Sequence, residues 1–288
     1  SVGTLRGGLY NDTGATVRLR NQADGLIENH GSITLTGSLY GNGTFQQASS
    51  GTFDLAGYTA TLGALDGNGT IDMGAGGLFV GDSNSDTSFA GTITGSGNFT
   101  KTGTGTLTLT GISNYGGPTQ ILGGTLRLAD GGAIGAGNVH NDATLAFDGT
   151  VDQSFGNAIS GNGGVTKSGT GLMTLTGTNS YWGGTAVLGG SLGFDHGQAL
   201  GNGAVTLADG TRLRNVQGVA PITIGNAIQV DSSGMATLQG VDGSSTTFIG
   251  AISGGTVRFG LSGGGATAFT LDVANSYGDT RIGGGVAL

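Results

Sequence analysis

The chain has 288 residues, including 65 glycines, 2 prolines and no cysteine, and its formal net charge is −8. Only 10% of the residues are charged, so the chain lacks the clustered lysine and arginine that nucleic acids and anionic membranes require. The absence of cysteine excludes a disulfide framework and a thiolate metal site. No apolar run approaches the roughly 18 residues of a membrane-spanning helix.

In residues 1–87, short runs in which apolar and polar residues alternate predict β-strands. Glycine-rich corners separate these runs, and the clearest are the Gly-Asn-Gly turns at 41–43 and 67–69. The predicted strands of this part of the chain cover residues 32–36, 52–55, 59–62, 70–73 and 78–80.

A 66-residue repeat begins after this segment. Residues 103–111 return as 169–177, and at the same offset Tyr115 returns as Tyr181 and Lys101 as Lys167. Self-similarity at a fixed period is typical of solenoids, in which each unit buries its apolar face against its neighbours.

Within the repeat, Leu107 and Leu109 alternate with threonines, so we expect the leucines to point inward and Thr108 outward. In the second copy we expect Leu175 to point inward in the same way. No segment of 12 or more residues has a convincing helical period. Further strands are predicted at 106–110, 125–128, 144–147, 204–207, 211–214, 221–224, 227–230, 236–238, 256–259 and 268–271.

These patterns predict an all-β fold, a right-handed parallel β-helix. Three coils of about 22 residues fit one repeat, so the chain holds roughly 13 coils. We expect a single domain over residues 1–288, because no linker or composition break divides it. Its parts are divergent coils at 1–87, the first repeat copy at 88–153, the second copy with a spacer at 154–246, and a partial, degraded third copy at 247–288.

Two serines lie in sequences that resemble hydrolase nucleophile loops. Ser191 lies in a G-x-S-x-G pattern, but no helix follows it and its repeat partner is Thr125, which indicates a structural strand position. Ser83 follows Gly81-Asp82 in a polar excursion at 81–87, but a triad also needs a histidine with an orienting carboxylate. The three histidines lie beside turn residues and are interpreted as solvated; they are His30, His140 and His196. The sequence therefore predicts no catalytic residue.

Carboxylates offer the next candidates. Asp24, Glu28 and His30 form the densest ionisable cluster, which we interpret as a projecting loop rather than a metal or lyase centre. Asp82 and Asp86 are weighed as Ca²⁺ ligands, but they lack the spacing of a dedicated site. We expect no metal and no cofactor.

The remaining candidates form a possible binding surface. Lys101 and Lys167 are the only lysines and share one repeat position; they are either solvated, bonded to corner carbonyls, or part of a ligand site. The repeating tyrosines either cover corners between coils or form a carbohydrate-binding row, and Trp182 is the best exposed aromatic candidate. The possible surface therefore comprises Tyr115, Tyr181, Trp182, Tyr277, Lys101 and Lys167.

Residues 98–134 and 164–200 resemble the passenger-associated transport repeat of Gram-negative autotransporters. The motif begins at 99–111 and 165–177, and its Gly-Gly corners lie at 123–124 and 189–190; a degraded third copy lies at 275–285. The resemblance implies a β-helical passenger fragment at the cell surface or secreted, whose natural chain continues into a C-terminal outer-membrane barrel. The repeat itself is linked to passage across the outer membrane.

The resemblance therefore favours a non-catalytic surface passenger that acts in adhesion or self-association. Its partners would be the host-cell surface, matrix, a glycan, or the same protein on neighbouring cells, with no nucleic acid. An alternative is a passive stalk that displays an N-terminal protease, esterase or toxin domain. A third class, a polysaccharide-cleaving β-helix enzyme, fits poorly with so few charged residues.

Overall fold

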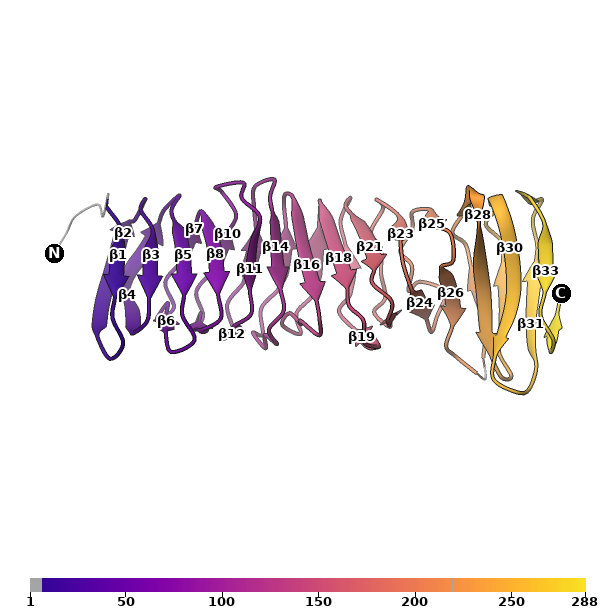
Figure 1. Cartoon of the computed structure of the whole chain (residues 1–288), viewed down its shortest axis with the longest axis horizontal. Coiled ribbons are helices and arrows are strands. Elements are labelled where there is room, and N and C mark those ends of the chain that lie inside the picture. Colours follow the sequence, from indigo (N-terminus) through magenta and orange to yellow (C-terminus); the bar gives the residue numbers. More distant parts are fainter. Residues whose placement is uncertain (1–6, 219) are drawn as a thin grey trace. The chain divides into compact units, whose positions relative to one another are not determined.

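The computed structural model describes residues 7–218 and 220–288 (Figure 1). Over these residues the chain forms a parallel β-solenoid of about 14 turns, without a helix. The predicted all-β solenoid of roughly 13 coils is therefore confirmed. No helix in the described ranges is long and apolar enough to cross a membrane.

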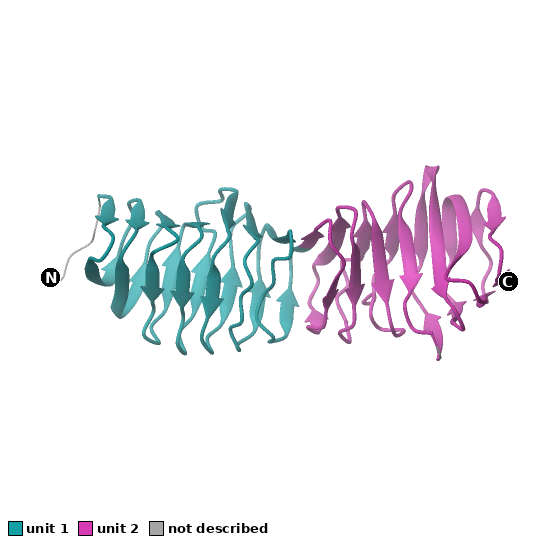
Figure 2. Cartoon of the chain, turned by 60° about the horizontal axis from the view of Figure 1, so that its bottom comes forward, with its two compact units in different colours: residues 1–145 teal, residues 146–288 magenta. Residues whose placement is uncertain are grey.

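The chain divides into two compact units, residues 1–145 and residues 146–288 (Figure 2). Lys101 and the first repeat tyrosine, Tyr115, belong to the first unit, and Lys167, Tyr181 and Trp182 belong to the second. The expectation of one continuous domain stays a prediction.

Short strands build the first unit, and each coil contributes two or three of them. In chain order they are β1 (Leu9–Asn11), β2 (Thr16–Gln22), β3 (Ile27–Asn29), β4 (Ser32–Tyr40), β5 (Thr44–Gln47), β6 (Thr52–Asp54), β7 (Ala60–Leu62), β8 (Ala64–Gly67), β9 (Thr70–Asp72), β10 (Leu78–Val80), β11 (Thr87–Phe89), β12 (Thr92–Thr94), β13 (Phe99–Lys101), β14 (Thr106–Leu109), β15 (Thr119–Ile121), β16 (Thr125–Ala129) and β17 (Val139–Asn141).

Every strand pairing in this unit is parallel, and each joins one coil to the next. Along one face β1 pairs with β3, β3 with β5 and β5 with β8. Along a second face β7 pairs with β10, β10 with β13 and β13 with β15. The long strand β4 turns a corner, because its first half pairs with β6 and its end pairs with β7. Through this parallel stacking, the backbone N–H and C=O groups of each coil form hydrogen bonds with those of the neighbouring coils.

The second unit repeats this arrangement with longer strands toward its end. Its strands are β18 (Thr144–Asp148), which starts at the boundary, β19 (Gln153–Phe155), β20 (Ile159–Ser160), β21 (Gly164–Ser168), β22 (Leu172–Leu175), β23 (Thr185–Val187), β24 (Ser191–Phe194), β25 (Val205–Leu207), β26 (Arg212–Asn215), β27 (Pro221–Ile224), β28 (Ile228–Val241), β29 (Ser245–Phe248), β30 (Ile252–Ser262), β31 (Thr267–Leu271), β32 (Ser276–Tyr277), β33 (Thr280–Ile282) and β34 (Val286–Ala287).

Strands β4 and β30 are longer than the predicted 32–36 and 256–259, and β28 differs most from its prediction. Two strands were expected at 227–230 and 236–238, but both belong to β28, which runs from Ile228 to Val241. The first part of β28 pairs with β25 and the later part with β26, so this strand continues around a corner. An irregularity in its pairing with β30, between Val230 and Met235, provides the bend.

The core consists of inward side chains stacked from coil to coil. Leu107 and Leu109 are 1% exposed and lie opposite Leu126 and Leu128 in register, while Thr108 is half-buried on the other face. Leu175 is likewise buried. The predicted inward and outward faces are therefore confirmed. Each buried leucine contributes about 1.5–3 kcal/mol relative to an exposed one.

Close contact between coils explains much of the glycine. At Gly67, φ is +102°, and a Cβ atom would lie 1.9 Å from the carbonyl oxygen of Gln47 on the preceding coil. Any larger residue would have to push two coils apart at such a corner. Glycine is therefore required by the distance between stacked backbones as well as by backbone conformation.

Candidate functional site

The two repeat tyrosines lie inside the solenoid. Tyr115 and Tyr181 are 0% exposed, and the hydroxyl of each forms a hydrogen bond with a threonine four residues on, at 2.7 Å to Thr119 Oγ1 and 2.6 Å to Thr185 Oγ1. Burial raises the pKa of both phenols to about 12, and the hydrogen bonds oppose this shift. The expected binding role is wrong for these two tyrosines, because a fully buried ring offers no surface to a ligand.

The two lysines are also buried, and their ammonium groups are fully engaged. Lys101 Nζ donates to the carbonyl oxygens of Thr102, Gly103 and Gly123, with distances of 3.3 Å to Gly103 and 3.2 Å to Gly123. Thr102 and Gly103 form the lysine's own corner, whereas Gly123 belongs to the next coil. A lysine has three N–H donors, so all of them are used.

Lys167 repeats this geometry 66 residues later. It donates to the carbonyl oxygens of Ser168, Gly169 and Gly189, with distances of 3.0 Å to Gly169 and 3.3 Å to Gly189. Of the alternatives weighed from the sequence, bonding to corner carbonyls is therefore confirmed. The lysine ligand site is wrong, because Lys101 and Lys167 are only 1% and 2% exposed and have no donor left for a ligand.

Carboxylates balance the buried charges. Burial lowers the pKa of the Lys101 ammonium, and the negative charges of Asp86 and Asp82 act in the opposite direction. Both carboxylates also bond to the next coil: Asp82 Oδ1 accepts from Thr102 Oγ1 at 2.6 Å, and Asp86 Oδ1 accepts from the Thr106 backbone at 2.7 Å. These aspartates, weighed as Ca²⁺ ligands from the sequence, therefore serve as links between coils.

The same arrangement surrounds Lys167. Burial lowers its pKa, and Asp148 and Asp152 oppose the shift. Asp152 Oδ1 accepts from the Leu172 backbone at 2.8 Å, as Asp86 does from Thr106 in the first copy. Lysine, two aspartates and corner carbonyls thus form one repeated structural unit.

The candidate serines lie in different local structures. Ser191 begins β24 and pairs in parallel register with Leu172, so it lies within a strand and not at a strand-to-helix elbow. Ser83 Oγ is enclosed and, within the described part of the chain, has no hydrogen-bond partner. Within the described part of the chain, neither serine forms a hydrogen bond with a histidine.

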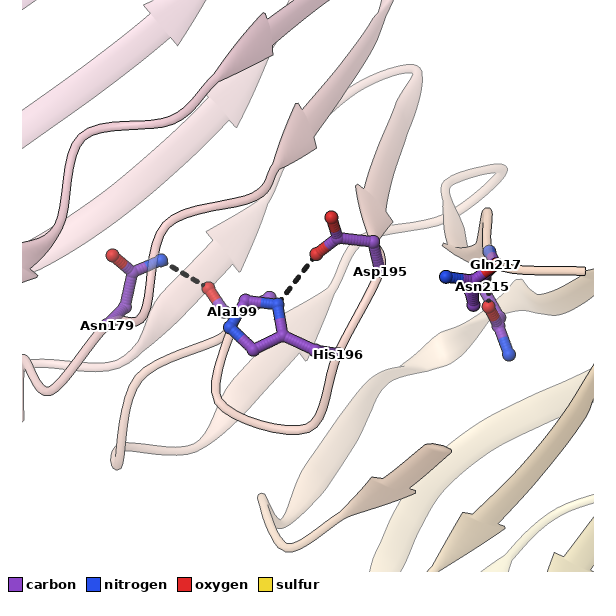
Figure 3. A network of polar contacts seen from close by, with 6 residues as sticks. All are labelled: Asn179, Asp195, His196, Ala199, Asn215 and Gln217. Atoms are coloured by element: carbon purple, nitrogen blue, oxygen red, sulfur yellow. Dashed lines mark hydrogen bonds and ion pairs between the residues drawn. The ribbon is translucent and has the colours of Figure 1, made fainter. Parts of the chain in front are cut away.

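Two histidines pair with neighbouring aspartates, which the sequence analysis did not anticipate. His196 Nδ1 lies 2.6 Å from Asp195 Oδ1 in the loop between β24 and β25 (Figure 3). His140 Nε2 lies 2.9 Å from Asp142 Oδ2. The other nitrogen of His196, Nε2, is enclosed and lacks a partner among the described residues. An Asp–His pair orients an imidazole, but a nucleophile positioned against Nε2 would be needed for triad chemistry.

The polar network beside this pair joins coils. Asn179 Nδ2 donates to the Ala199 carbonyl at 2.6 Å (Figure 3). Its Oδ1 accepts from the Ile159 backbone N–H at 2.8 Å. Asn215 Oδ1 accepts from the Gln217 backbone at 2.8 Å in the same view. Asn179 therefore bonds to the coil before it and the coil after it.

The cluster at the start of the chain does not form a metal site. Asp24 Oδ2 accepts from Gln22 Nε2 at 2.6 Å, and the ring of His30 lies 5.0 Å from that of Tyr10. Glu28 lies within β3. Across residues 7–218 and 220–288, no group of three or more histidine, aspartate or glutamate side chains is placed to hold a metal ion.

Trp182 differs from the other candidates because it is exposed. Its side chain is 66% exposed and lies at the edge of a hollow of about 410 Å³, whose lining residues are Trp182, Gly197, Gln198, Gly201, Asn202, Gly225 and Asn226. Tyr277 is half-buried in β32, and its binding role stays a prediction. Of the predicted surface, Trp182 is the member that lines this hollow.

Sequence reasoning missed the partners of Trp182, although a signal for them exists. Residues 131–139 and 197–205 align at the same 66-residue offset, with glycines preserved at 135 and 201 and at 137 and 203. Within this alignment Gln198 replaces Gly132 and Asn202 replaces Ala136. Comparing where the copies differ, rather than where they agree, identifies these two side chains.

Stacked parallel coils, tied together by a lysine, a tyrosine and glycine corners that recur every 66 residues, define a repeat-built β-solenoid. The model of the passenger-associated transport repeat family matches this chain at residues 99–128 and 165–193. These two matches contain Lys101, Tyr115, Lys167 and Tyr181.

The chain is also similar to the adhesin BmaC autotransporter of Brucella suis biovar 1 (strain 1330). The two are 33% identical over 192 residues, which is 61% of this chain and 5% of the relative, so the chain spans only a small part of that protein's length. No solved structure matches the chain. The predicted resemblance to a repeat-bearing autotransporter passenger is thereby confirmed.

Proposed function

We propose that the chain is part of a non-catalytic autotransporter passenger that acts in adhesion or self-association at the surface of a Gram-negative bacterium. The observation that carries the proposal is the similarity to an autotransporter adhesin, which extends over 192 residues and thus well beyond the two matched repeats. The partners we propose are the host-cell surface, matrix or a glycan, or copies of the same protein on neighbouring cells.

The exposed surface supports this proposal. Thr206 and Gln229 are exposed neighbours in register on adjacent coils, and such uncharged rows offer many weak polar contacts. Two leucines at one repeat position, Leu122 and Leu188, are 50% and 60% exposed. Each polar contact is worth about 0.5–1.5 kcal/mol, so useful strength requires many contacts at once.

The absence of catalysis is part of the proposal. The lysines and tyrosines that recur in the two copies have their polar atoms engaged within the solenoid. We expect purified protein to hydrolyse no ester, peptide or polyuronate above background. Hydrolysis that is lost in Ser83→Ala or Ser191→Ala would overturn this part of the proposal.

The adhesive function is tested with beads coated at high density with the chain. We expect the free protein to be largely monomeric in dilute solution and the coated beads to clump or to bind host cells or matrix. The double variant Thr206→Lys, Gln229→Lys should reduce clumping, because like charges would then face each other between coats within a Debye length of about 8 Å. The control is the double variant Asn138→Lys, Thr150→Lys, which adds the same charge at two exposed positions outside this row and should leave clumping largely unchanged.

Two results would contradict the proposal. Dense coats that stay dispersed and bind neither cells nor matrix would exclude adhesion and leave the passive stalk. Equal loss of clumping in both double variants would show that net charge alone governs the association, and the row of outward side chains would then have no role.

A further inference from the structure

We propose that the hollow beside Trp182 is a binding site for a neutral carbohydrate, an inference that rests on the proposed adhesive function and names a ligand class for it. The hollow measures about 410 Å³, within the range of about 300–1,000 Å³ usual for small-molecule sites. All its lining residues belong to the second unit.

The lining residues have the chemistry of a sugar site. Trp182 offers an exposed, flat aromatic face on which the C–H face of a pyranose ring can stack. Gln198 and Asn202 offer amide groups that can both donate to and accept from sugar hydroxyls, and Asn226 offers its amide oxygen as an acceptor. One aromatic platform and three amides therefore match a ligand that is apolar on its face and hydroxylated at its rim.

The ligand should be uncharged, because no charged side chain lines the hollow. The formal net charge of −8 also disfavours acidic sugars. An anionic ligand such as a uronate or a sulfated glycan would need a lysine or arginine at the site, and both lysines of the chain are buried in corners. The lack of a basic side chain at the hollow and the net negative charge of the chain both favour a neutral oligosaccharide over an acidic one.

Hydrogen bonds within the solenoid hold two of the amides in place. Asn226 is buried and donates from Nδ2 to the carbonyl oxygens of Gly201 at 3.0 Å and Gly203 at 2.7 Å. Asn202 Nδ2 donates to the Ser180 carbonyl at 3.0 Å. Each oriented amide keeps its Oδ1 as an acceptor, so a hydroxyl of the sugar meets a preformed partner.

The backbone beneath Trp182 is equally fixed. The Trp182 backbone N–H donates to the Gly161 carbonyl at 3.0 Å, and that of Asn202 donates to the Tyr181 carbonyl at 2.8 Å. Trp182, Asn202 and Asn226 come from successive coils, so the parallel stack sets their spacing. The buried ring of Tyr181 lies under this surface, against Gly201.

The first repeat copy provides an internal comparison. Gly116 and Ala136 occupy the positions of Trp182 and Asn202, and both are exposed there. Much of the frame around them recurs, because the buried tyrosine and the corner glycines are present in both copies, although Gly184 stands where the first copy has Pro118. Trp182 and Asn202 are therefore dispensable for the repeat fold, and their presence in the second copy needs a reason outside folding.

The test uses the fact that Trp182 is the only tryptophan of the chain, so tryptophan emission reports on this hollow alone. The full chain is titrated with the neutral oligosaccharides cellohexaose, maltohexaose, mannohexaose and chitohexaose, and with oligogalacturonate and heparin fragments as acidic probes. We expect a saturable emission change with at least one neutral oligosaccharide, with a Kd of about 0.1–1 mM.

Variants then separate the site from general effects. Asn202→Ala, which copies the first repeat, and Gln198→Ala should each weaken binding about tenfold. Trp182→Gly should abolish capture on the same sugars immobilised as an array, and Trp182→Phe should restore part of it because a ring is again present. Val151→Ala is the matched control, since it removes an exposed side chain of this unit outside the hollow.

Three results would overturn the inference. They are no saturable change with any neutral oligosaccharide, a response to the acidic probes alone, and neutral binding that persists unchanged in the Gln198→Ala, Asn202→Ala double variant. Circular dichroism confirms that each variant is folded. Failure here would leave bead clumping and cell binding intact, whereas failure of the adhesive function would leave sugar-dependent emission unchanged, so the two proposals are separable.

Discussion

The buried lysine of the second copy gives the sharpest test of how the coils are held together. In Lys167→Met the side chain keeps a similar length but loses its charge and all three donors. The carbonyl oxygens of Ser168, Gly169 and Gly189 then lose a partner at once. Because Gly189 lies on the next coil, the change removes two bonds within one corner and one link between two corners.

Two opposing terms set the magnitude. Each hydrogen bond from a charged donor contributes about 1.5–3 kcal/mol. Burying the ammonium costs free energy, as the lowered pKa of Lys167 indicates, and methionine avoids this cost. Three lost bonds outweigh the recovered cost, and we expect the free energy of unfolding to fall by about 2–4 kcal/mol.

The assay is urea unfolding followed by circular dichroism, with midpoint and slope both fitted. Lys101→Met should give a similar loss, because its three bonds repeat the same geometry. The matched control is Arg258→Met, which removes one positive charge from an exposed strand position. A loss in Lys167→Met no larger than in this control would refute the structural role of the lysine corner.

Three further predictions follow from the core, the tyrosines and the glycines. Leu109→Asp buries an unpaired carboxylate and should lower the free energy of unfolding in urea by about 3–5 kcal/mol, whereas Thr108→Asp on the outward face should lower it by less than about 1 kcal/mol. Equal losses would refute the assignment of Leu109 to the inward face and Thr108 to the outward face. The pKa of Tyr115 and Tyr181 is raised from 10.0 to about 12, so the folded state holds these protons more tightly. The contribution of each tyrosine to the free energy of unfolding, about 3 kcal/mol, is therefore complete below pH 10 and is lost between pH 10 and 12. An alkaline unfolding titration should show this loss for the natural chain and not for the Tyr115→Phe, Tyr181→Phe double variant. Gly67→Ala should lower the urea midpoint strongly, because its Cβ would lie 1.9 Å from the Gln47 carbonyl oxygen; an unchanged midpoint would mean that the coils can separate there.

Much of the fold was predictable because apolar and polar residues alternate along many of the strands. The predicted strand at 78–80 is β10 and that at 221–224 is β27, without any shift. Other three-residue strands, such as β15 (Thr119–Ile121), were missed, since so short a run has too few residues to define a period by itself. Such strands exist because the coils above and below supply their hydrogen bonds, and a single sequence does not reveal that pairing.

The site was harder to predict than the fold. Trp182 was selected as an exposed aromatic, but its partners Gln198, Asn202 and Asn226 lie 16 to 44 residues away in the chain and meet it through stacking of coils. The lengths of successive coils vary, since Val205 pairs with Thr185 and with Ile228. Without the register of each coil, the sequence does not place these amides beside the indole.

In this solenoid, the residues that recur between the repeat copies are structural, and the candidate binding residue Trp182 is one that does not recur. A residue that contacts two coils, such as Lys167 or Tyr181, constrains both, so the same residue recurs wherever the same corner is built. An exposed position such as 116 or 182 contacts solvent, and changing it leaves the stack intact. Side chains that recur are therefore best explained by packing, and those that depart from the repeat on an unchanged frame are the ones free to be selected for binding. The carbohydrate hypothesis therefore applies to Trp182, the aromatic side chain that the first copy lacks, and not to the row of repeated tyrosines.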